Sequence, residues 1–587
     1  MKHSEKNAAL SALAGRLLML LPVVSGAALG VMIIETLTFQ GLATRFWPGS
    51  QAGPQVLTDS ARLWIVISMS AGFLVLWAGL SAALKGARSF YESLLRCAWP
   101  FAPFLSILVL YVLDAYGAAP GLMVFSIYAA ILASAAFPAM VTMLATADGK
   151  QPLQAWVGWG QRHAGALVAI AALVYFVTFS TMGWLQYDSM NISYTDTADW
   201  EQMLWNTLQG RFLQASEFDH MFFGEHVQFV HLLLLPFYAV FPSLKTLMIF
   251  KSAALASGAF PVYLLARRRL SSKAAGVALA GAYLLYAPMQ WLDLELVYNT
   301  FRPVAFAVPA LLWAVYFYDT RRFGAFLAVA FLAMAAKEEM ALPVAMLAML
   351  WMLDGKRIRG ACVFLAAAAW FAAAIFWVIP HVRGSESHIV NYYRDFGENL
   401  TFSGLLLQII SRPLYTLQVA LRPVKIEYLL LLAIPLGLRT LFSWRMMLVM
   451  LPSLATTLLA SRDPSYRIHY HYQAALVPFM VMGAVYGVEN CRGILARTPF
   501  FMRGIEDELR RRAALGGLCV LVVLSALFSN VLFAQSPISL LFYNPSMQTY
   551  WRNRYVPNGR TRHFFEIVRP LVPGDASVSA TEFAATY

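Results

Sequence analysis

The chain has 587 residues and a formal net charge of +13, and its composition is 59% hydrophobic and only 13% charged. Soluble domains carry about 25% charged residues, so a soluble globular protein is excluded, and the long continuous apolar runs exclude the short alternating segments of a β-barrel. The composition therefore predicts an all-α polytopic membrane protein. The cations are spread over many short loops, which argues against nucleic-acid binding, and the four cysteines suggest no disulfide framework.

The N-terminal part, residues 1–160, is predicted to be a separate module of four membrane helices. Its apolar segments lie near 17–40, 62–84, 98–116 and 121–146. Cations precede the first segment and no small-residue cleavage site follows it, which indicates an uncleaved signal anchor rather than a removed signal peptide.

Apolar segments continue through the rest of the chain and bring the expected number of transmembrane helices to about fifteen. They lie near 163–185, 246–266, 274–290, 303–318, 323–337, 338–353, 359–380, 426–440, 445–460, 472–488 and 514–534. Segment 227–242 is short for a span and contains Pro236, so we expect a membrane-surface or re-entrant helix there.

The distribution of cations predicts the orientation in the plasma (cytoplasmic or inner) membrane. Basic connections occur at 85–96, 150–162, 267–273, 321–322, 356–359 and 492–512. By the positive-inside rule these connections and the N-terminus lie in the cytoplasm. Segments 186–245, 381–425, 461–471 and 535–587 are then extracytoplasmic.

The first large outer loop is acidic in an otherwise basic chain. Residues 186–226 hold seven acids and two histidines but a single cation, Arg211. Segment 198–214 has the apolar spacing of an amphipathic interfacial helix, with Asp199 as its expected N-cap. Acids placed here could provide a general base or bind a divalent metal; the alternative is a solvated loop whose charges keep it out of the bilayer.

Carboxylates and imidazoles of this loop form the first candidate site. They are Asp196, Glu201, Asp219, His220, Glu225 and His226, with Gly224 permitting a tight backbone approach. A divalent metal, Mg or Mn, held by Asp196, Asp219 and His226 is one expectation, but the spacing matches no specific metal motif.

Charged residues also interrupt the apolar run from Phe323 to Leu353. The run has 31 residues, which is too short for two complete spans and long for one, and Lys337, Glu338 and Glu339 lie at its middle. Because charges inside a membrane are costly, we expect them at the turn of a hairpin that dips from the outer face. The alternative is one helix with a functional charge cluster.

Cations of two later outer loops are candidate phosphate ligands. They are Arg383, His388, Arg394, Arg412 and Arg422 in or beside 381–425, and Arg462, Arg467, His469 and His471 in the next loop. Guanidinium groups bind phosphate bidentately, so these residues could hold a lipid-linked phosphate; interfacial snorkelling is the alternative. The HYHY sequence at His469–Tyr472 fits a metal pair or, more commonly, an aromatic belt.

The order of several motifs resembles the membrane family catalogued as domain of unknown function 2079. They are D-x5-Q-x2-WN-x3-G (Asp196, Gln202, Trp205, Asn206, Gly210), G-x-H (Gly224, His226), a proline-broken helix at Pro236, P-x-Y-x-L-A-R (Pro261 to Arg267), KE (Lys337, Glu338), H-Y-x5-P (His471, Tyr472, Pro478) and P-x-x-A-S-V-S-A (Pro573 to Ala580). The resemblance covers roughly 165–587. A histidine in the family's F-H-P-E motif is replaced here by ELVYNTFRP (Glu295–Pro303), where Tyr298 or Arg302 could take its role.

That family is in turn similar to the GT-C superfamily of integral-membrane glycosyltransferases. The resemblance implies that a sugar passes from a polyprenyl-phosphate donor to a glycan, lipid or protein acceptor on the extracytoplasmic face, with Asp196 in the position of the catalytic acid. The candidate catalytic residues are Asp196, Glu201 and His226, and the candidate substrate or phosphate ligands are Lys337, Glu338, Gln202, Asn206, Arg394, Arg467 and His471.

Two other functions stay open at this point, a transporter or flippase for a lipid-linked or polar solute and a membrane scaffold. The chain shows no clear internal repeat and its acids concentrate on one outer loop, which favours an enzyme. The expected division is the 1–160 module, a GT-C-like core at 161–535 and a tail at 536–587. The end of the tail reads as the first strand of a small, truncated domain.

Overall fold

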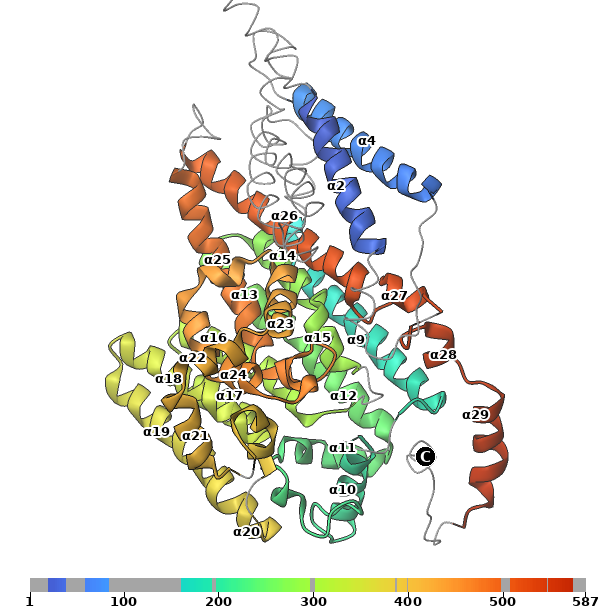
Figure 1. Cartoon of the computed structure of the whole chain (residues 1–587), viewed down its shortest axis with the longest axis vertical. Coiled ribbons are helices and arrows are strands. Elements are labelled where there is room, and N and C mark those ends of the chain that lie inside the picture. Colours follow the sequence, from blue (N-terminus) through green and yellow to red (C-terminus); the bar gives the residue numbers. More distant parts are fainter. Residues whose placement is uncertain are drawn as a thin grey trace, which may run out of the picture. The chain divides into compact units, whose positions relative to one another are not determined.

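The computed structural model describes residues 20–38, 59–83, 160–192, 197–295, 301–385, 388–398, 400–497, 507–545 and 547–573 (Figure 1). These residues form helices and no strands, which confirms the predicted all-α class. Four described helices are long and apolar enough to cross a membrane: Ala164–Asp188, Leu244–Leu270, Arg357–Arg383 and Ala514–Phe533. The total of about fifteen spans stays a prediction, and the expected segments at 98–116 and 121–146 lie outside the described residues.

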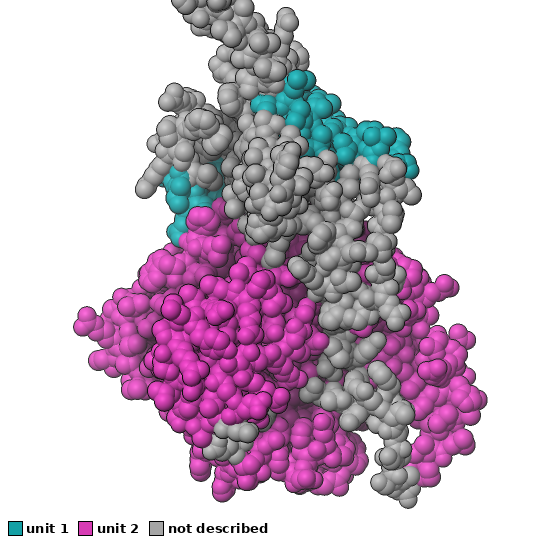
Figure 2. All heavy atoms as spheres, in the orientation of Figure 1, with its two compact units in different colours: residues 1–163, 488–525 teal, residues 164–487, 526–587 magenta. Residues whose placement is uncertain are grey.

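The chain forms two compact units, residues 1–163 with 488–525 and residues 164–487 with 526–587 (Figure 2). In the first unit, α2 (Leu21–Thr38) packs against α4 (Asp59–Ala83). A Cβ atom on Gly26 would lie 2.7 Å from the Met69 carbonyl oxygen, and one on Gly30 would lie 2.9 Å from the Val66 Cα. The two glycines, one helical turn apart, therefore let the backbones approach closely, as small residues do between membrane helices.

The helices after residue 163 follow the apolar segments of the sequence. They are α9 (Ala164–Asp188), α12 (Leu244–Ser257), α13 (Ala259–Leu270), α14 (Lys273–Leu284), α15 (Ala287–Asp293), α16 (Ala307–Asp319), α17 (Phe323–Ala336), α18 (Ala341–Leu353), α19 (Arg357–Ala373), α20 (Ile379–Arg383), α21 (Phe402–Ser411), α22 (Pro413–Ala420), α23 (Pro423–Ala433), α24 (Trp444–Leu459), α25 (Val477–Arg497) and α26 (Asp507–Phe533). In the second unit, α9 packs on α12 and α14, α13 packs on α14 and α16, and α18 packs on α19 and α24.

The amphipathic helix expected in the acidic loop is present as α10 (Asp199–Leu208). Its Trp200 and Leu204 side chains are buried, whereas Trp205 is 47% exposed. The expectation that Asp199 is the N-cap is wrong. Ala198 occupies that position with helical backbone angles and no side-chain cap, because the chain already turns helically before α10 begins and leaves no extended cap residue.

Segment 227–242 forms two short helical turns, η4 (Val230–Leu234) and α11 (Leu235–Val240). Pro236 lies in the first turn of α11, where a proline needs no hydrogen bond, so it does not break a longer helix. The Phe229 N–H donates to the Ala335 carbonyl at the end of α17 (2.9 Å). The segment is therefore attached to the core and too short to cross, in keeping with a surface or re-entrant helix.

Helices α17 and α18 form the two arms of a hairpin. Arg321 Nη2 lies 2.6 Å from Asp354 Oδ2, so the start of α17 and the end of α18 meet. Lys337 ends α17 in an extended conformation, and the short turn η6 (Glu338–Met340) leads into α18. The 14 residues of α17 make an arm of about 21 Å, shorter than a hydrocarbon core of about 30 Å.

The direction of this hairpin differs from the expectation. Its open end lies among the basic connections, and its tip contacts His226 of the acidic loop through Glu338. In the predicted orientation the hairpin therefore enters from the cytoplasmic side, not from the outer face. The basic connections 321–322 and 356–359 flank both ends of the run, so the positive-inside rule places the open end of the hairpin in the cytoplasm.

The described part of the tail belongs to the same unit as 164–487. It contains α27 (Leu540–Tyr543), α28 (Trp551–Tyr555), α29 (Gly559–His563), η13 (Phe564–Val568) and η14 (Arg569–Leu571). Asn191 donates to the carbonyls of Asn553 (3.0 Å) and Arg554 (3.1 Å) and so ties the tail to the end of α9. Residues 567–571, at the start of the segment where a strand was expected, are helical, and 574–587 lie outside the described residues.

Candidate functional site

The carboxylate of Glu338 lies at the centre of the contacts at the hairpin tip. His226 Nδ1 lies 2.8 Å from Glu338 Oε1, and the Val227 N–H donates to Oε2 at 3.0 Å. Glu338 is 1% exposed, whereas the His226 side chain is 23% exposed. A carboxylate that holds Nδ1 orients the imidazole and directs Nε2 away from the pair, which is how a histidine is positioned as a general base.

Lys337 brings a buried cation to the same turn. Its Nζ lies 3.2 Å from Glu339 Oε1 and 5.9 Å from the centre of the Tyr472 ring. Lys337 directly follows α17 and has an extended backbone, so its side chain starts at the end of that helix. A buried ammonium beside an acid and an aromatic ring is a suitable ligand for an incoming phosphate, which it would bind as a point charge.

Glu225 connects the acidic loop to the end of α20. Its carboxylate pairs with Arg383 and lies 3.3 Å from His220 Nε2. A Cβ on Gly224 would lie 2.5 Å from His220 Nδ1, so the tight approach expected of this glycine is confirmed. We call the residues joined here the hairpin-tip cluster: Glu225, His226, Lys337, Glu338, Glu339 and Arg383.

A second group of charges, the Glu295 cluster, adjoins the first through Tyr472. The buried Glu295 carboxylate lies 3.1 Å from His471 Nδ1 and 3.4 Å from Arg302 Nε. The His471 ring stacks on Tyr472 with centroids 4.4 Å apart, and Tyr472 in turn lies under Lys337. Four of the predicted site residues are therefore brought into one region: His226, Lys337, Glu338 and His471.

Sequence reasoning did not select Glu295 as a site residue. It lies at the end of an apolar stretch, beside the segment where the family histidine is missing, and this position was the only signal in the sequence. Arg302, one of the two expected substitutes for that histidine, pairs with Glu295. Tyr298, the other, lies outside the described residues.

Three candidates of the acidic loop hold the loop itself together. The Gln202 amide donates to Ser216 Oγ and accepts from the Ser216 N–H at 2.7 Å. Asn206 donates to the Gln214 carbonyl at 2.8 Å. Glu201 accepts from the Tyr238 hydroxyl at 3.4 Å, and burial raises the pKa of Glu201 to about 7 against the lowering effect of that hydrogen bond. None of these hydrogen bonds leads to the hairpin tip.

The remaining candidates lie apart from these contacts. Arg467 pairs with Asp463, Nη2 to Oδ1, at 2.9 Å. Arg394 lies in η8 (His388–Phe396) and Asp219 is exposed in the acidic loop. Asp196, the residue in the position of the catalytic acid, lies outside the described residues.

No metal centre is formed by the residues that the structure describes, since no three of their His, Cys, Asp or Glu side chains gather around a common point. The metal expected at Asp196, Asp219 and His226 stays a prediction. In the HYHY sequence the two imidazoles have different neighbours: His469 packs edge-on against Trp291 at 4.8 Å, and His471 contacts Glu295.

Comparison with known proteins identifies one family. A family model described as a predicted membrane protein, DUF2079, matches residues 186–583, which is more than half of the chain. No curated protein and no solved structure matches the chain. The matched range includes every residue of the hairpin-tip cluster and of the Glu295 cluster.

Proposed function

The chain belongs to the DUF2079 family of predicted membrane proteins, and we propose that it is a GT-C-type glycosyltransferase. The donor is a sugar on polyprenyl phosphate, and the acceptor is a hydroxyl of a glycan, lipid or protein. The reaction takes place on the extracytoplasmic face of the cytoplasmic (inner) membrane, with the N-terminus in the cytoplasm. The reaction class is motivated by the similarity of the DUF2079 family, which the motif order resembles, to the GT-C superfamily.

The observation that carries the proposal is the composition of the hairpin-tip cluster. His226 is oriented by the buried carboxylate of Glu338, and the residue before Glu338 in the chain is a buried cation, Lys337. Transfer from a lipid phosphate needs these two functions, a base for the acceptor and a positive charge for the departing phosphate. Lys337 and Glu338 lie on the turn between α17 and α18, and Glu338 holds His226, so the fold fixes the positions of the base and the cation.

The proposed step is an inverting displacement at the anomeric carbon. The base removes the proton of the acceptor hydroxyl, and the acceptor oxygen forms its bond to the anomeric carbon. The bond from that carbon to the phosphate oxygen breaks, and polyprenyl phosphate leaves with the electron pair. Lys337 stabilises the charge that develops on the phosphate, so no strong general acid is required.

Two residues compete for the role of the base. The resemblance assigns it to Asp196, and the contacts of His226 suit it for the same role or for orienting the acceptor. A divalent metal, Mg or Mn, belongs to the proposal as an optional aid to the leaving phosphate.

The test is sugar transfer in lipid nanodiscs that contain radiolabelled polyprenyl-phosphate hexose or pentose. We expect D196N or H226Q to lower kcat by about 100-fold or more, as the loss of a general base does. K337Q should lower kcat as well as raise KM for the donor, because Lys337 stabilises the charge that develops on the leaving phosphate, while R552Q, which removes an exposed cation from α28, should leave both constants unchanged. The enzyme proposal is wrong if none of the donors binds and none transfers its sugar to any acceptor fraction.

A buried ion pair keeps transport as a second candidate. Lys251 of α12 lies 3.2 Å from Asp293 at the end of α15, and both side chains are at most 1% exposed. Ionisable residues within membrane helices often mark a solute or proton path. Flux of a lipid-linked sugar across sealed vesicles that is lost in K251M/D293N, which leaves no buried charge unpaired, and retained in D196N would favour transport over transfer.

A further inference from the structure

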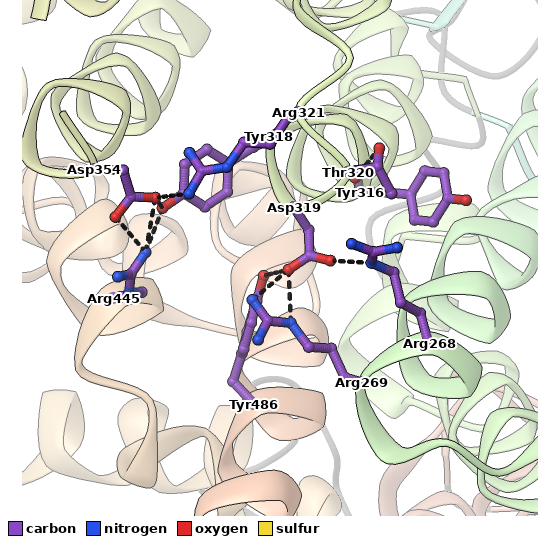
Figure 3. A network of polar contacts seen from close by, with 10 residues as sticks. All are labelled: Arg268, Arg269, Tyr316, Tyr318, Asp319, Thr320, Arg321, Asp354, Arg445 and Tyr486. Atoms are coloured by element: carbon purple, nitrogen blue, oxygen red, sulfur yellow. Dashed lines mark hydrogen bonds and ion pairs between the residues drawn. The ribbon is translucent and has the colours of Figure 1, made fainter. Parts of the chain in front are cut away.

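At the open end of the hairpin, a network of arginines and tyrosines surrounds two aspartates (Figure 3). We call it the basic-end network: Arg268, Arg269, Tyr318, Asp319, Arg321, Asp354, Arg445 and Tyr486. Its residues come from α13, α16, α24 and α25 and from the connections that follow α16 and α18. None of them takes part in the proposed transfer reaction.

Asp319 is the first of the two anchors. Its carboxylate, 1% exposed, accepts from Arg268 Nε at 3.0 Å and from Arg269 Nε at 2.6 Å. The Tyr486 hydroxyl donates to the same carboxylate at 3.1 Å, and the Arg269 guanidinium lies over the Tyr486 ring at 4.9 Å. The buried acid thus fixes the direction of two arginines that end α13.

Asp354 is the second anchor, and its surroundings repeat the first. It lies 2.6 Å from Arg321 Nη2 and 3.0 Å from Arg445 Nη1, and it accepts from the Tyr318 hydroxyl at 2.7 Å. In Figure 3 the guanidinium groups of Arg321 and Arg445 converge on this carboxylate. Four arginines, two for each carboxylate, therefore contact the two acids.

The outer guanidinium groups keep donors for another partner. Arg268 is 58% exposed and contacts Asp319 through Nε, and Arg321 is 47% exposed and contacts Asp354 through Nη2. A guanidinium carries five N–H donors, so each of these exposed arginines has donors beyond the one that contacts its aspartate. The ion pairs fix the orientation of the Arg268 and Arg321 side chains, whereas the side chain of a snorkelling arginine can take several orientations.

The surface around the network is both cationic and apolar. Six further cations are exposed in the same connections: Arg267, Lys273, Arg322, Lys356, Arg357 and Arg359. Large apolar side chains are exposed between them, with Ile358 at 81%, Leu353 at 61% and Trp444 at 59%. A soluble anion has no hydrocarbon to contact these apolar groups. A phospholipid in a bilayer has both a phosphate and acyl chains, so it can contact the cations and the apolar groups together.

We propose that the basic-end network binds the phosphate of an anionic bilayer phospholipid. The oriented guanidinium groups of Arg268 and Arg321 donate to phosphate oxygens, the surrounding cations add charge, and Ile358 and Leu353 contact the upper acyl chain. The binding is independent of the proposed transferase activity, because it uses the opposite ends of α16, α17 and α18.

The experiment measures lipid retention by native mass spectrometry of the full chain. The protein in detergent is mixed with dioleoyl phosphatidylglycerol, cardiolipin or, as the neutral lipid, dioleoyl phosphatidylcholine. We expect selective retention of the two anionic lipids. The double variant R322Q/R357Q should weaken that retention by about 30-fold, since each surface cation contributes about fivefold to anionic-lipid binding. Neither residue makes an ion pair with a described residue, so this variant should fold normally.

Two controls make the test specific. R552Q/R560Q removes the same number of exposed charges from the tail and should retain anionic lipid like the parent chain. The variant R268Q/R321Q, which touches the anchored arginines, should lose more than R322Q/R357Q at equal thermal stability. Three outcomes would each overturn the proposal. They are equal retention of neutral and anionic lipid, an equal loss of anionic-lipid retention in R552Q/R560Q, and saturation of the binding site by inorganic phosphate without lipid.

Discussion

At the scale of single residues, buried charges with several partners determine which substitutions the core tolerates. Asp293 receives the Tyr175 hydroxyl at 2.9 Å and the Ser252 hydroxyl at 2.8 Å, and it pairs with Lys251. Each oxygen of the carboxylate thus accepts a hydrogen bond, and the cation has its counter-charge. Breaking such a pair leaves an uncompensated buried charge, which costs far more than the intact pair contributes.

Asp293→Asn is therefore expected to lower the free energy of unfolding by about 3–5 kcal/mol, because Lys251 loses its counter-charge in a buried site. The double variant K251M/D293N should lose less than the sum of the two single losses, since no charge is left unpaired. Thermal unfolding in detergent, followed by tryptophan fluorescence, measures both. Strictly additive losses would show that the two charges do not interact.

A second residue-scale prediction concerns the pH dependence of the acidic loop. Burial raises the pKa of Glu201 from 4.5 to about 7, so the folded chain binds this proton more tightly than the unfolded chain. The resulting stabilisation is complete below about pH 4.5 and is lost as the pH rises through about 7, with a total of at most about 3 kcal/mol. E201Q should remove this part of the pH dependence of the melting temperature between pH 4 and 8. If the melting temperature of E201Q changes with pH as steeply as that of the parent chain, the raised pKa of Glu201 is contradicted.

At the scale of elements, the sequence located the helices but not their contacts. Apolar runs predicted α9, α16, α24 and most others, because long hydrophobic segments have few alternatives to helix in a membrane. The charged turn at Lys337 was recognised because charges inside an apolar run are costly. The expected hairpin direction was mistaken, although the cations at 321–322 and 356–359 already placed both ends of the run on the basic side.

Helix contacts made through glycine give the element-scale prediction. A Cβ on Gly487 of α25 would lie 1.8 Å from the Arg439 carbonyl oxygen, whereas one on Gly281 of α14 would meet no atom within 4 Å. Gly487→Ala should thus destabilise the chain by about 3 kcal/mol or more, because backbone cannot move aside as a side chain can. Gly281→Ala should be neutral or stabilising by about 1 kcal/mol, since alanine favours helix. Melting temperatures of the two variants, purified side by side, distinguish these outcomes; equal values would mean that α25 does not approach Arg439 closely.

At the scale of the whole molecule, the sequence predicted that charge divides the second unit into an acidic face and a basic face. The candidates His226, Lys337, Glu338 and His471 come from three distant segments, and their common position near one face followed from the predicted orientation alone. Their individual contacts could not be predicted. They depend on how α15, η5 (Pro303–Phe306) and the hairpin turn pack, and packing leaves no periodic pattern in the sequence.

The orientation is open to a direct test by cysteine labelling in sealed cells. Glu217→Cys in the acidic loop and Lys273→Cys between α13 and α14 both replace exposed side chains, so neither should disturb the fold. In a background without the native cysteines, we expect a membrane-impermeant maleimide to label position 217 in intact cells and position 273 only after permeabilisation, because the positive-inside rule places the basic connections in the cytoplasm. Labelling of both positions in intact cells would place the acidic and basic faces on the same side of the membrane. The short hairpin would then have no bilayer to cross, and the proposed extracytoplasmic site and the proposed lipid surface could not both be correct.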